Sequence, residues 1–277
     1  MSWLRKYTLK CGKPGGKGFE TSALHVAFSV SCNEDKSGNN ATLSIWNLNA
    51  EHEAMVCEKD CYVEIRAGYE DTSLIEVFKG YVTYGDGDLD GADWRTDLEL
   101  VDGRVEVRDT YVSKSYSGST NQKNIIDDIG KEMDLTVTYA EGVEFSDIPN
   151  GYSFVGKGAA SLDKACAVNG LSWYIDKGVL KIKPAKKPMS RQVYELSADT
   201  GLIGWPKKLT KSGESGEDKD VTGYEVRYFL NADIKIGDYI YLNSKRVKGY
   251  FRVQSLKIDG DNMSGDWTCT ATLMEEG

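Results

Sequence analysis

The stretch Ala41-Thr-Leu-Ser-Ile-Trp-Asn-Leu48 alternates apolar and polar residues along its length. A period of two places every second side chain on one face of a β-strand, so the stretch predicts a strand with one buried and one solvated face. The same alternation recurs in residues 61–67, 77–83 and 94–101. Strands at this spacing, joined by turn-rich segments such as residues 86–91, predict a sandwich or a barrel.

The composition sets outer limits on size and function. The chain has 277 residues, with 34 Lys and Arg against 43 Asp and Glu, and a formal net charge of −9. That length suffices for one large domain or two to three smaller ones, each with a hydrophobic core. An acidic chain is a poor candidate for gripping nucleic acid through its phosphates. No apolar run approaches the roughly 20 residues of a membrane-spanning helix, and the segment Met1–Tyr7 contains no secretory signal core.

The middle of the chain changes from strand to helix patterns. Residues 124–133 carry apolar side chains at 125, 126, 129 and 133, which is helical spacing. Either Thr120 or Asn121 is placed to cap that helix. A short strand is predicted at residues 135–139.

A second helix and a hairpin follow. The second helix is predicted over residues 159–168, with Ser161 as a candidate cap and Asn169-Gly170 as its end. Residues 171–175 and 179–183 predict a β-hairpin.

The end of the chain returns to strand patterns after a linker at residues 184–188. The predicted fold is therefore mainly β with an α+β insert. Two β-barrel-like domains, residues 1–111 and 191–277, flank a small α/β domain at residues 112–190.

One acidic stretch resembles a calcium-binding loop. Asp86, Asp88, Asp90 and Asp97 stand at relative positions 1, 3, 5 and 12, with Gly91 at position 6. The alternative is a polar turn whose glycines supply positive φ. Flanking strands in place of helices, and Asp in place of Glu at the last ligand, favour the bare turn. We expect no tightly held calcium.

Catalytic patterns are scarce. The only histidines are His25 and His52, and His25 reads as a strand residue. Cys57 and Cys61 would share a strand face too far apart to form a disulfide, so small buried thiols are the favoured interpretation. The many acids leave a glycosidase-like carboxylate pair open, although nothing indicates which two. We assign no catalytic, cofactor-binding or metal-binding residue, and expect no cofactor and no enzyme.

The order of the strand motifs resembles that of the baseplate hub proteins of phage tails. The resemblance rests on residues 41–48, 59–69, 77–82 and 94–103, followed by 162–173, 193–196, 231–238 and 249–253. Together they span most of residues 20–275. The spike-like modules of bacterial secretion machines share this fold.

The resemblance implies a structural virion protein of contractile tails and related injection machines. Its members form homotrimeric rings that join the tail tube to the central spike and surround part of the DNA ejection channel. The implied partners are the tail tube protein, the central spike protein and other baseplate proteins, with DNA passing without specific binding. The implied location is the tail baseplate, after assembly in the host cytoplasm. Interface residues stay unassigned, and no fused peptidoglycan-cleaving domain is apparent.

Two further expectations and one alternative accompany that interpretation. The 16 Tyr and 6 Trp suit either a core or interface anchors, and a ring interface would bury upwards of ~2,000 Å². We also expect a net negative channel surface that repels phosphate, although the acids could instead serve solubility.

The alternative function is a glycan-binding or peptidoglycan-cleaving β protein acting on the cell envelope.

The segment from Lys211 to Asp220 is predicted to be disordered in the isolated chain. It is rich in charge and glycine and has no apolar anchor between Leu209 and Val221, so it cannot offset an ordering cost of roughly 1–2 kcal/mol per residue. Limited proteolysis should cut first at Lys211 or Lys219, and more slowly in the assembled tail. Resistance there, while other loops are nicked, would contradict the prediction.

Overall fold

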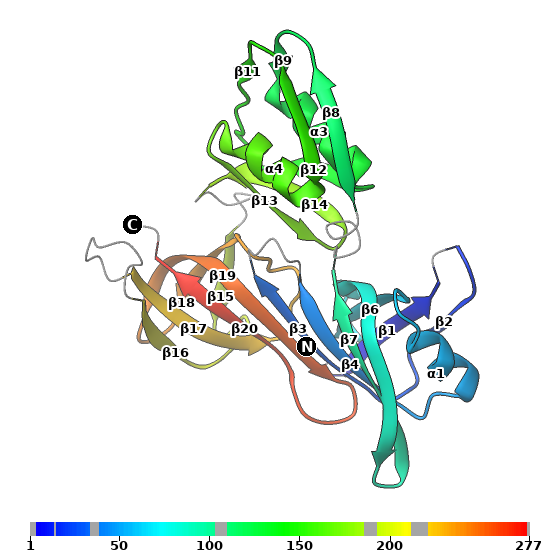
Figure 1. Ribbon diagram of the computed structural model, residues 1–277. Coiled ribbons are helices and arrows are strands. Elements are labelled where there is room, and N and C mark those ends of the chain that lie inside the picture. The colour runs from blue at the N-terminus through cyan, green and yellow to red at the C-terminus, as the bar shows by residue number, and fades with distance from the viewer. Residues whose placement is uncertain are drawn as a thin grey trace. The chain divides into compact units, whose positions relative to one another are not determined.

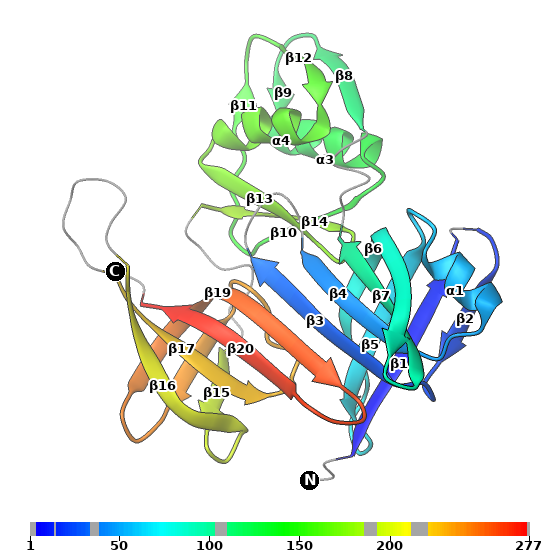
Figure 2. The ribbon, with the colours of Figure 1, turned by 60° about the horizontal axis from the view of Figure 1, so that its bottom comes forward.

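Strands dominate the computed structural model, which describes residues 4–13, 15–33, 39–102, 110–185, 193–211 and 221–275. The mainly-β class with an α+β insert is confirmed. The chain divides into two compact units (Figures 1 and 2): unit 1 comprises residues 1–34, 40–101 and 191–277, and unit 2 comprises residues 35–39 and 102–190. The finer division at 1–111, 112–190 and 191–277 stays a prediction.

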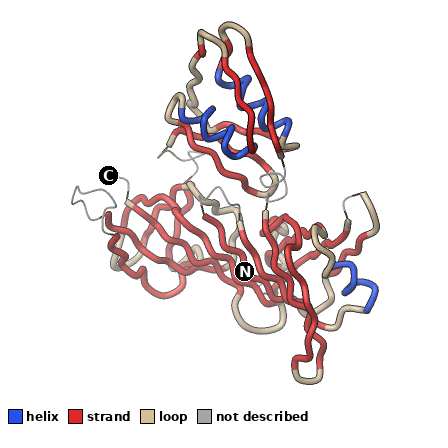
Figure 3. The backbone as a smooth tube through the Cα atoms, in the orientation of Figure 1, coloured by secondary structure: helices blue, strands red, loops and turns tan. Residues whose placement is uncertain are grey.

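Unit 1 contains helix α1 (Ala50–Val56) and strands from both ends of the chain (Figure 3). The strands are β1 (Arg5–Gly12), β2 (Gly18–Thr21), β3 (Val26–Asn33), β4 (Asn40–Trp46), β5 (Tyr62–Tyr69), β6 (Ile75–Asp90), β7 (Asp93–Val101), β15 (Val193–Ser197), β16 (Leu202–Lys211), β17 (Val221–Phe229), β18 (Tyr239–Asn243), β19 (Lys248–Asp261) and β20 (Trp267–Met274).

These strands form a single 13-stranded sheet. Eleven of them lie in the order β16-β17-β20-β19-β3-β4-β7-β6-β5-β1-β2, with β18 paired to β19 and β15 paired to β18. Lys211 ends β16, so it belongs to a strand rather than to the predicted loop. The rest of that loop, residues 212–220, lies outside the described residues.

The two ends of the chain meet where β3 pairs antiparallel with β19, from Ser255↔Asn33 to Asp261↔Ala27. Gly260 lies opposite Phe28, and a side chain at position 260 would overlap the Phe28 ring. The same ring packs edge-on against Trp267 at 5.7 Å. Glycine is therefore required for close approach at this point, and one continuous core extends beneath both halves of unit 1.

Helix α1 was not predicted, although its start carries a recognisable signal. The Asn49 side chain accepts a 2.8 Å hydrogen bond from the backbone N–H of His52, as an N-cap residue does. The helix ends at Cys57, so Cys57 and Cys61 do not share a strand as considered from the sequence. Among the described residues, no helix is long and apolar enough to cross a membrane.

Unit 2 holds helices α3 (Gln122–Glu132) and α4 (Gly158–Ala167) and three small sheets. The helices share a core with the three-stranded sheet β10-β14-β13. The strands are β8 (Tyr111–Tyr116), β9 (Thr120–Asn121), β10 (Thr136–Tyr139), β11 (Asp147–Ile148), β12 (Tyr152–Lys157), β13 (Leu171–Asp176) and β14 (Val179–Pro184).

The predicted elements of unit 2 are largely confirmed, with one correction. Asn121 caps α3 by accepting a hydrogen bond from the Lys123 N–H at 3.0 Å. Ser161 does not cap α4: the N-cap residue is Lys157, and the Ser161 hydroxyl donates instead to the Lys157 carbonyl from inside the helix. A polar residue one turn into a helix bonds back to the preceding carbonyl in this way.

A buried carboxylate holds the hairpin turn of unit 2. Lys177 and Gly178 connect β13 to β14 with φ angles of 55° and 73°. Both of their N–H groups donate to Asp102, the Gly178 bond being 3.0 Å long. Asp102 is only 2% exposed and also accepts a hydrogen bond from Asn39 at 3.4 Å. The two chain segments that lead into unit 2 are thereby joined to its hairpin.

Replacing Asp102 by Ala should lower the free energy of unfolding of unit 2 by about 2–4 kcal/mol. The variant leaves buried N–H donors without a charged acceptor, and hydrogen bonds to charged groups contribute roughly 1.5–3 kcal/mol each. Urea denaturation, with hydrogen exchange at residues 177 and 178, measures the effect. Glu144→Ala, at an exposed carboxylate of the same unit, is the control and should change stability by less than about 0.5 kcal/mol. Equal stability of both variants would contradict the assigned role.

Candidate functional site

The sheet of unit 1 presents one polar face from β16 to β6. Alternate residues of the central strands point away from the core on this face, as the period of two requires. They are mostly hydroxyl-bearing: Ser29, Ser31, Thr42, Ser44, Thr268, Thr270 and Thr272. The opposite face carries buried side chains such as Phe28, Leu43 and Leu98.

Hydrogen bonds and ion pairs connect neighbouring strands across this face. The Ser29 hydroxyl donates to Asp259 at 2.7 Å, and Lys257 lies 2.9 Å from the same carboxylate. The Ser44 hydroxyl donates to Asp97 at 2.6 Å. These bonds between strands hold the polar side chains in defined positions.

Carboxylates outnumber basic groups on the polar face. Among the side chains that the structure describes, the acids are Asp86, Asp88, Asp90, Asp93, Asp97, Glu99, Glu225, Asp259 and Asp261, and the bases are Arg95, Lys207, Arg227, Arg252 and Lys257. A surface with this excess repels phosphate groups.

One end of the face is a free, acidic strand edge. Strand β6 pairs with β5 only up to Tyr81, so its remaining residues pair with β7 alone among the described strands. Asp86, Asp88 and Asp90 are exposed along this edge. The negative charge of Asp86 raises the pKa of the neighbouring Tyr84 hydroxyl, which reports the local field.

Helix α1 supports this acidic hairpin from its other face. A side chain at position 85 would lie 2.9 Å from the Cys57 Cα atom, so Gly85 permits the contact. The Trp94 indole N–H donates to Glu53 of α1 at 2.5 Å. The hairpin is therefore held in place by tertiary contacts and not by its turn alone.

The other end of the face is a free, basic strand edge. Among the described strands, β16 pairs only with β17. A bulge between Ile203 and Lys207 interrupts this pairing, and it contains Pro206, a residue that strands accept at their edges. Lys207 and Lys208 are exposed beyond it. The exposed Trp205 ring lies 4.9 Å from the Arg246 guanidinium.

The acidic stretch is not the loop that the sequence suggested. Asp86, Asp88 and Asp90 lie inside β6, and the turn is confined to Gly91 and Ala92. Arg95 reaches Asp90 at 3.5 Å and Asp97 at 2.9 Å. No group of three metal-ligating side chains converges within the described residues. An extended strand spreads alternate carboxylates along an edge, whereas a loop would gather them around one point.

The histidine and the cysteines considered in the sequence make contacts that stabilise the fold. His25 lies just before β3, stacks on Trp46 at 3.8 Å and approaches Asp261 at 3.1 Å. None of the six cysteines, all of which the structure describes, forms a disulfide. Burial raises the pKa of the Cys269 thiol to about 12, so that thiol stays protonated and unreactive at neutral pH.

Neither of the two free edges was predicted from the sequence. Pro206 followed by paired lysines was a usable signal for one edge, because proline and lysine both mark strands without a neighbour. The acidic edge had no comparable signal, since the aspartates also matched a cation loop.

Comparison with known proteins identifies relatives of this arrangement. A family model described as Baseplate hub gp41 matches residues 34–267. The 43 kDa tail protein of prophage MuSo2 from Shewanella oneidensis superimposes with a TM-score of 0.67 at 11% identity, covering 97% of this chain and 96% of that one. A search of curated proteins found no match.

Two more solved structures have a similar fold. The tail protein from Neisseria meningitidis MC58 gives a TM-score of 0.63 at 10% identity, covering 98% of this chain and 97% of that one. The E. coli c3393 protein, a component of the type VI secretion system, gives 0.62 at 9% identity, covering 92% and 74%. At these identities the likeness shows the fold alone.

Calcium should raise the melting temperature of this protein very little. A site of micromolar affinity would add about 4 kcal/mol of stability at millimolar calcium, and the extended aspartates do not form one. Differential scanning calorimetry with calcium or EDTA is the measurement, with Asp88→Ala as the paired variant. A shift of several degrees that Asp88→Ala abolishes would show that the edge binds calcium.

Proposed function

Because this chain belongs to the baseplate hub gp41 family, and is thus a structural protein of the phage tail and its virion, we propose that three copies form the hub ring. The ring joins the tail tube to the central spike and encloses part of the DNA ejection channel. The role is structural rather than enzymatic. Other baseplate proteins bind the outer surface of the ring. The tail is assembled in the host cytoplasm.

The observation that carries this proposal is a single sheet with two strand edges of opposite charge that no other described strand covers, residues 84–90 of β6 and the outer edge of β16. Strand β6 offers Asp86, Asp88 and Asp90, and strand β16 offers Lys207 and Lys208. Pairing the β6 edge of one copy with the β16 edge of the next is a head-to-tail contact. Such heterologous contacts generate closed rings when the rotation between copies closes.

The edge charges also disfavour the competing assembly, a dimer in which two equal edges pair with each other. Two β6 edges would bring aspartates together, and two β16 edges would bring lysines together. Like charges directly opposite each other destabilise strand pairing, so back-to-back dimers are disfavoured. Specificity thus comes from repulsion between equal edges as well as from attraction between unequal ones.

The same geometry supports an acidic channel wall. The apolar face of the central strands packs into the core of unit 1, to which β1 and β5 of the same sheet contribute. When a sheet closes into a ring, the thicker side takes the larger outer circumference, which leaves the polar face inward. Its hydroxyls and excess carboxylates offer DNA a hydrated surface that repels phosphate and does not retain it.

Charge reversal at either edge should weaken the trimer about tenfold or more. Lys207→Glu with Lys208→Glu, or Asp86→Lys with Asp88→Lys, reverses the charge of one edge and turns attraction into repulsion, at roughly 0.5–1 kcal/mol per exposed charge. A chain that carries all four substitutions restores opposite charges and should recover the trimer. Light scattering coupled to size exclusion measures the mass over a range of concentrations.

The matched control reverses two exposed lysines outside both edge strands, Lys6→Glu on β1 with Lys235→Glu in the chain after β17. It should assemble as the unmodified chain does. An unmodified chain that stays monomeric at high concentration would overturn the ring. Trimers that tolerate either edge reversal would overturn the assignment of the edges.

A further inference from the structure

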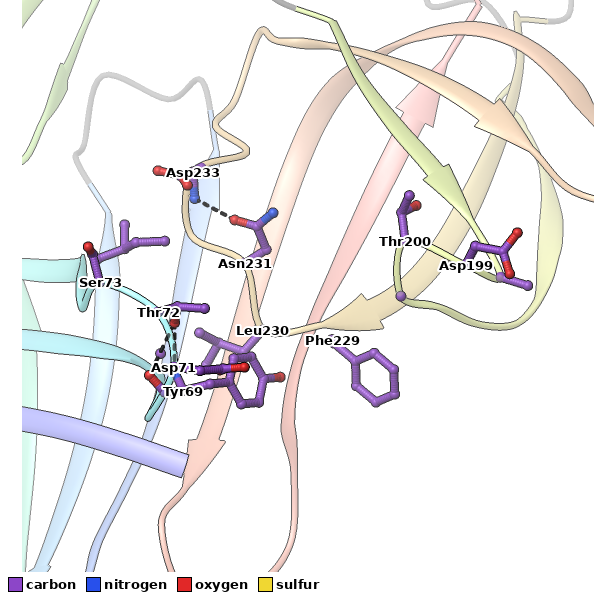
Figure 4. Close-up of a pocket in the computed structure, with 14 residues that line it drawn as sticks. Tyr69, Asp71, Thr72, Ser73, Asp199, Thr200, Phe229, Leu230, Asn231 and Asp233 are labelled. Carbon is purple, nitrogen blue, oxygen red and sulfur yellow. Dashed lines mark hydrogen bonds between the residues drawn. The ribbon is translucent and has the colours of Figure 1, made fainter. Parts of the chain in front are cut away.

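A cavity of about 550 Å³ lies within unit 1, away from the two sheet edges (Figure 4). Three segments line it: the turn between β5 and β6, the turn between β15 and β16, and the chain that follows β17. Its volume lies within the range of 300–1,000 Å³ typical of ligand sites in proteins. We call it the three-turn pocket.

The base of the three-turn pocket is apolar. Tyr69, Ile75, Phe229 and Leu230 contribute to its lining. Phe229 remains 36% exposed, and its backbone N–H donates to the Gly201 carbonyl at 3.0 Å. Gly201 has a φ of 107°, and a side chain there would lie 3.1 Å from the Phe229 ring. The turn therefore needs glycine for its conformation, and the absence of a side chain leaves room for the ring.

The rim of the pocket is acidic. Asp71, Asp199 and Asp233 each come from a different lining segment (Figure 4). Lys, Arg and His are absent from the lining residues that the structure describes. The pocket thus combines an apolar base with an acidic rim, which favours a ligand with one apolar group and neighbouring positive charge.

The lining turns are held by their own hydrogen bonds. The Thr72 hydroxyl accepts from the Tyr69 N–H at 3.1 Å, and the Thr200 hydroxyl accepts from the Ser197 N–H at 2.8 Å. The Asn231 side chain accepts from the Asp233 N–H at 3.0 Å. A preformed pocket loses little conformational entropy when a ligand enters, so even a short ligand can bind.

We propose that the three-turn pocket binds a peptide segment of another tail protein, in which a large apolar side chain is flanked by Lys or Arg. The apolar side chain enters among Phe229, Leu230 and Ile75, and the flanking cations face Asp199 and Asp233. The inference rests on the proposed function for the nature of the partner. It adds an attachment site that is separate from the edges of the ring.

The test uses the full chain and three synthetic peptides measured by calorimetry. Acetyl-Gly-Lys-Trp-Lys-Gly-amide should bind saturably, and should bind more weakly at 1 M salt because exposed charges are screened. The peptides with Ala in place of Trp, or with Gln in place of both Lys, should bind at least about fivefold more weakly. Equal binding of all three peptides would overturn the proposal.

Variants place the binding in the pocket. Asp199→Asn with Asp233→Asn should weaken the Lys-Trp-Lys peptide about fivefold, which corresponds to roughly 1 kcal/mol. Glu51→Gln with Asp60→Asn removes the same charge elsewhere and should leave the affinity unchanged. Equal losses in the two variants would show that only net charge matters, and no loss in either would place the peptide elsewhere. Both results contradict the proposal.

Light scattering on the same samples separates this inference from the proposed ring. A trimer that fails to bind the peptide overturns the pocket assignment alone. A monomer whose peptide binding depends on Asp199 and Asp233 overturns the ring alone, and the pocket assignment stands. Saturable binding by a second copy of this chain, in competition with the peptide, would replace the tail-protein partner and overturn the proposed occupant.

Discussion

The antiparallel pairing of β3 with β19 is the contact on which the rest of unit 1 depends. It joins residues 27–33 to residues 255–261, segments from opposite ends of the chain. The closest approach occurs at Gly260, where the Phe28 ring occupies the space that a side chain would need. We call the β3–β19 pairing the seam. Because it joins the strands from the two ends of the chain into one sheet, the core, the polar face and both free edges are properties of the joined sheet. A loop closure of this length costs entropy that only many simultaneous contacts can offset.

The seam also explains how a polar face can serve a ring. Each half alone would offer a short sheet, whereas the joined sheet carries both the acidic edge of β6 and the basic edge of β16, with six strands between them in the strand order. In the proposed ring, charge separated in this way along one molecule would define the direction of assembly. The three-turn pocket depends on the seam as well, since its walls come from both halves of unit 1.

Unit 2 relies on a different kind of constraint, a buried carboxylate. Asp102 accepts hydrogen bonds from the backbone of residues 177 and 178 and from Asn39. Burying a charge is costly unless hydrogen bonds satisfy it. Because these hydrogen bonds are made, the Asp102 carboxylate holds the segments that contain Asn39 and Asp102 to the β13–β14 turn. Unit 2 also has its own small core.

The sequence by itself determined the local elements and, through the order of its motifs, the family. Alternation at 41–48 and helical spacing at 124–133 arise from neighbouring residues, so they survive in any context. Asn121, Gly170 and the Lys177-Gly178 turn acted through local hydrogen bonds and positive φ angles. Ser161 was wrongly predicted as a cap, and the aspartates from 86 to 90 were predicted in a turn although they lie inside β6. Both assignments depend on what surrounds the residues and not on the residues alone.

Only the tertiary structure decided which strands are neighbours. The pairing of β3 with β19, the edge position of β6 and the three walls of the pocket join residues far apart in the chain. Hydrophobic periodicity states which face of a strand is buried but not which strand lies beside it. That choice depends on shape and on close approaches such as the one at Gly260, and these exist only after the whole sheet has formed.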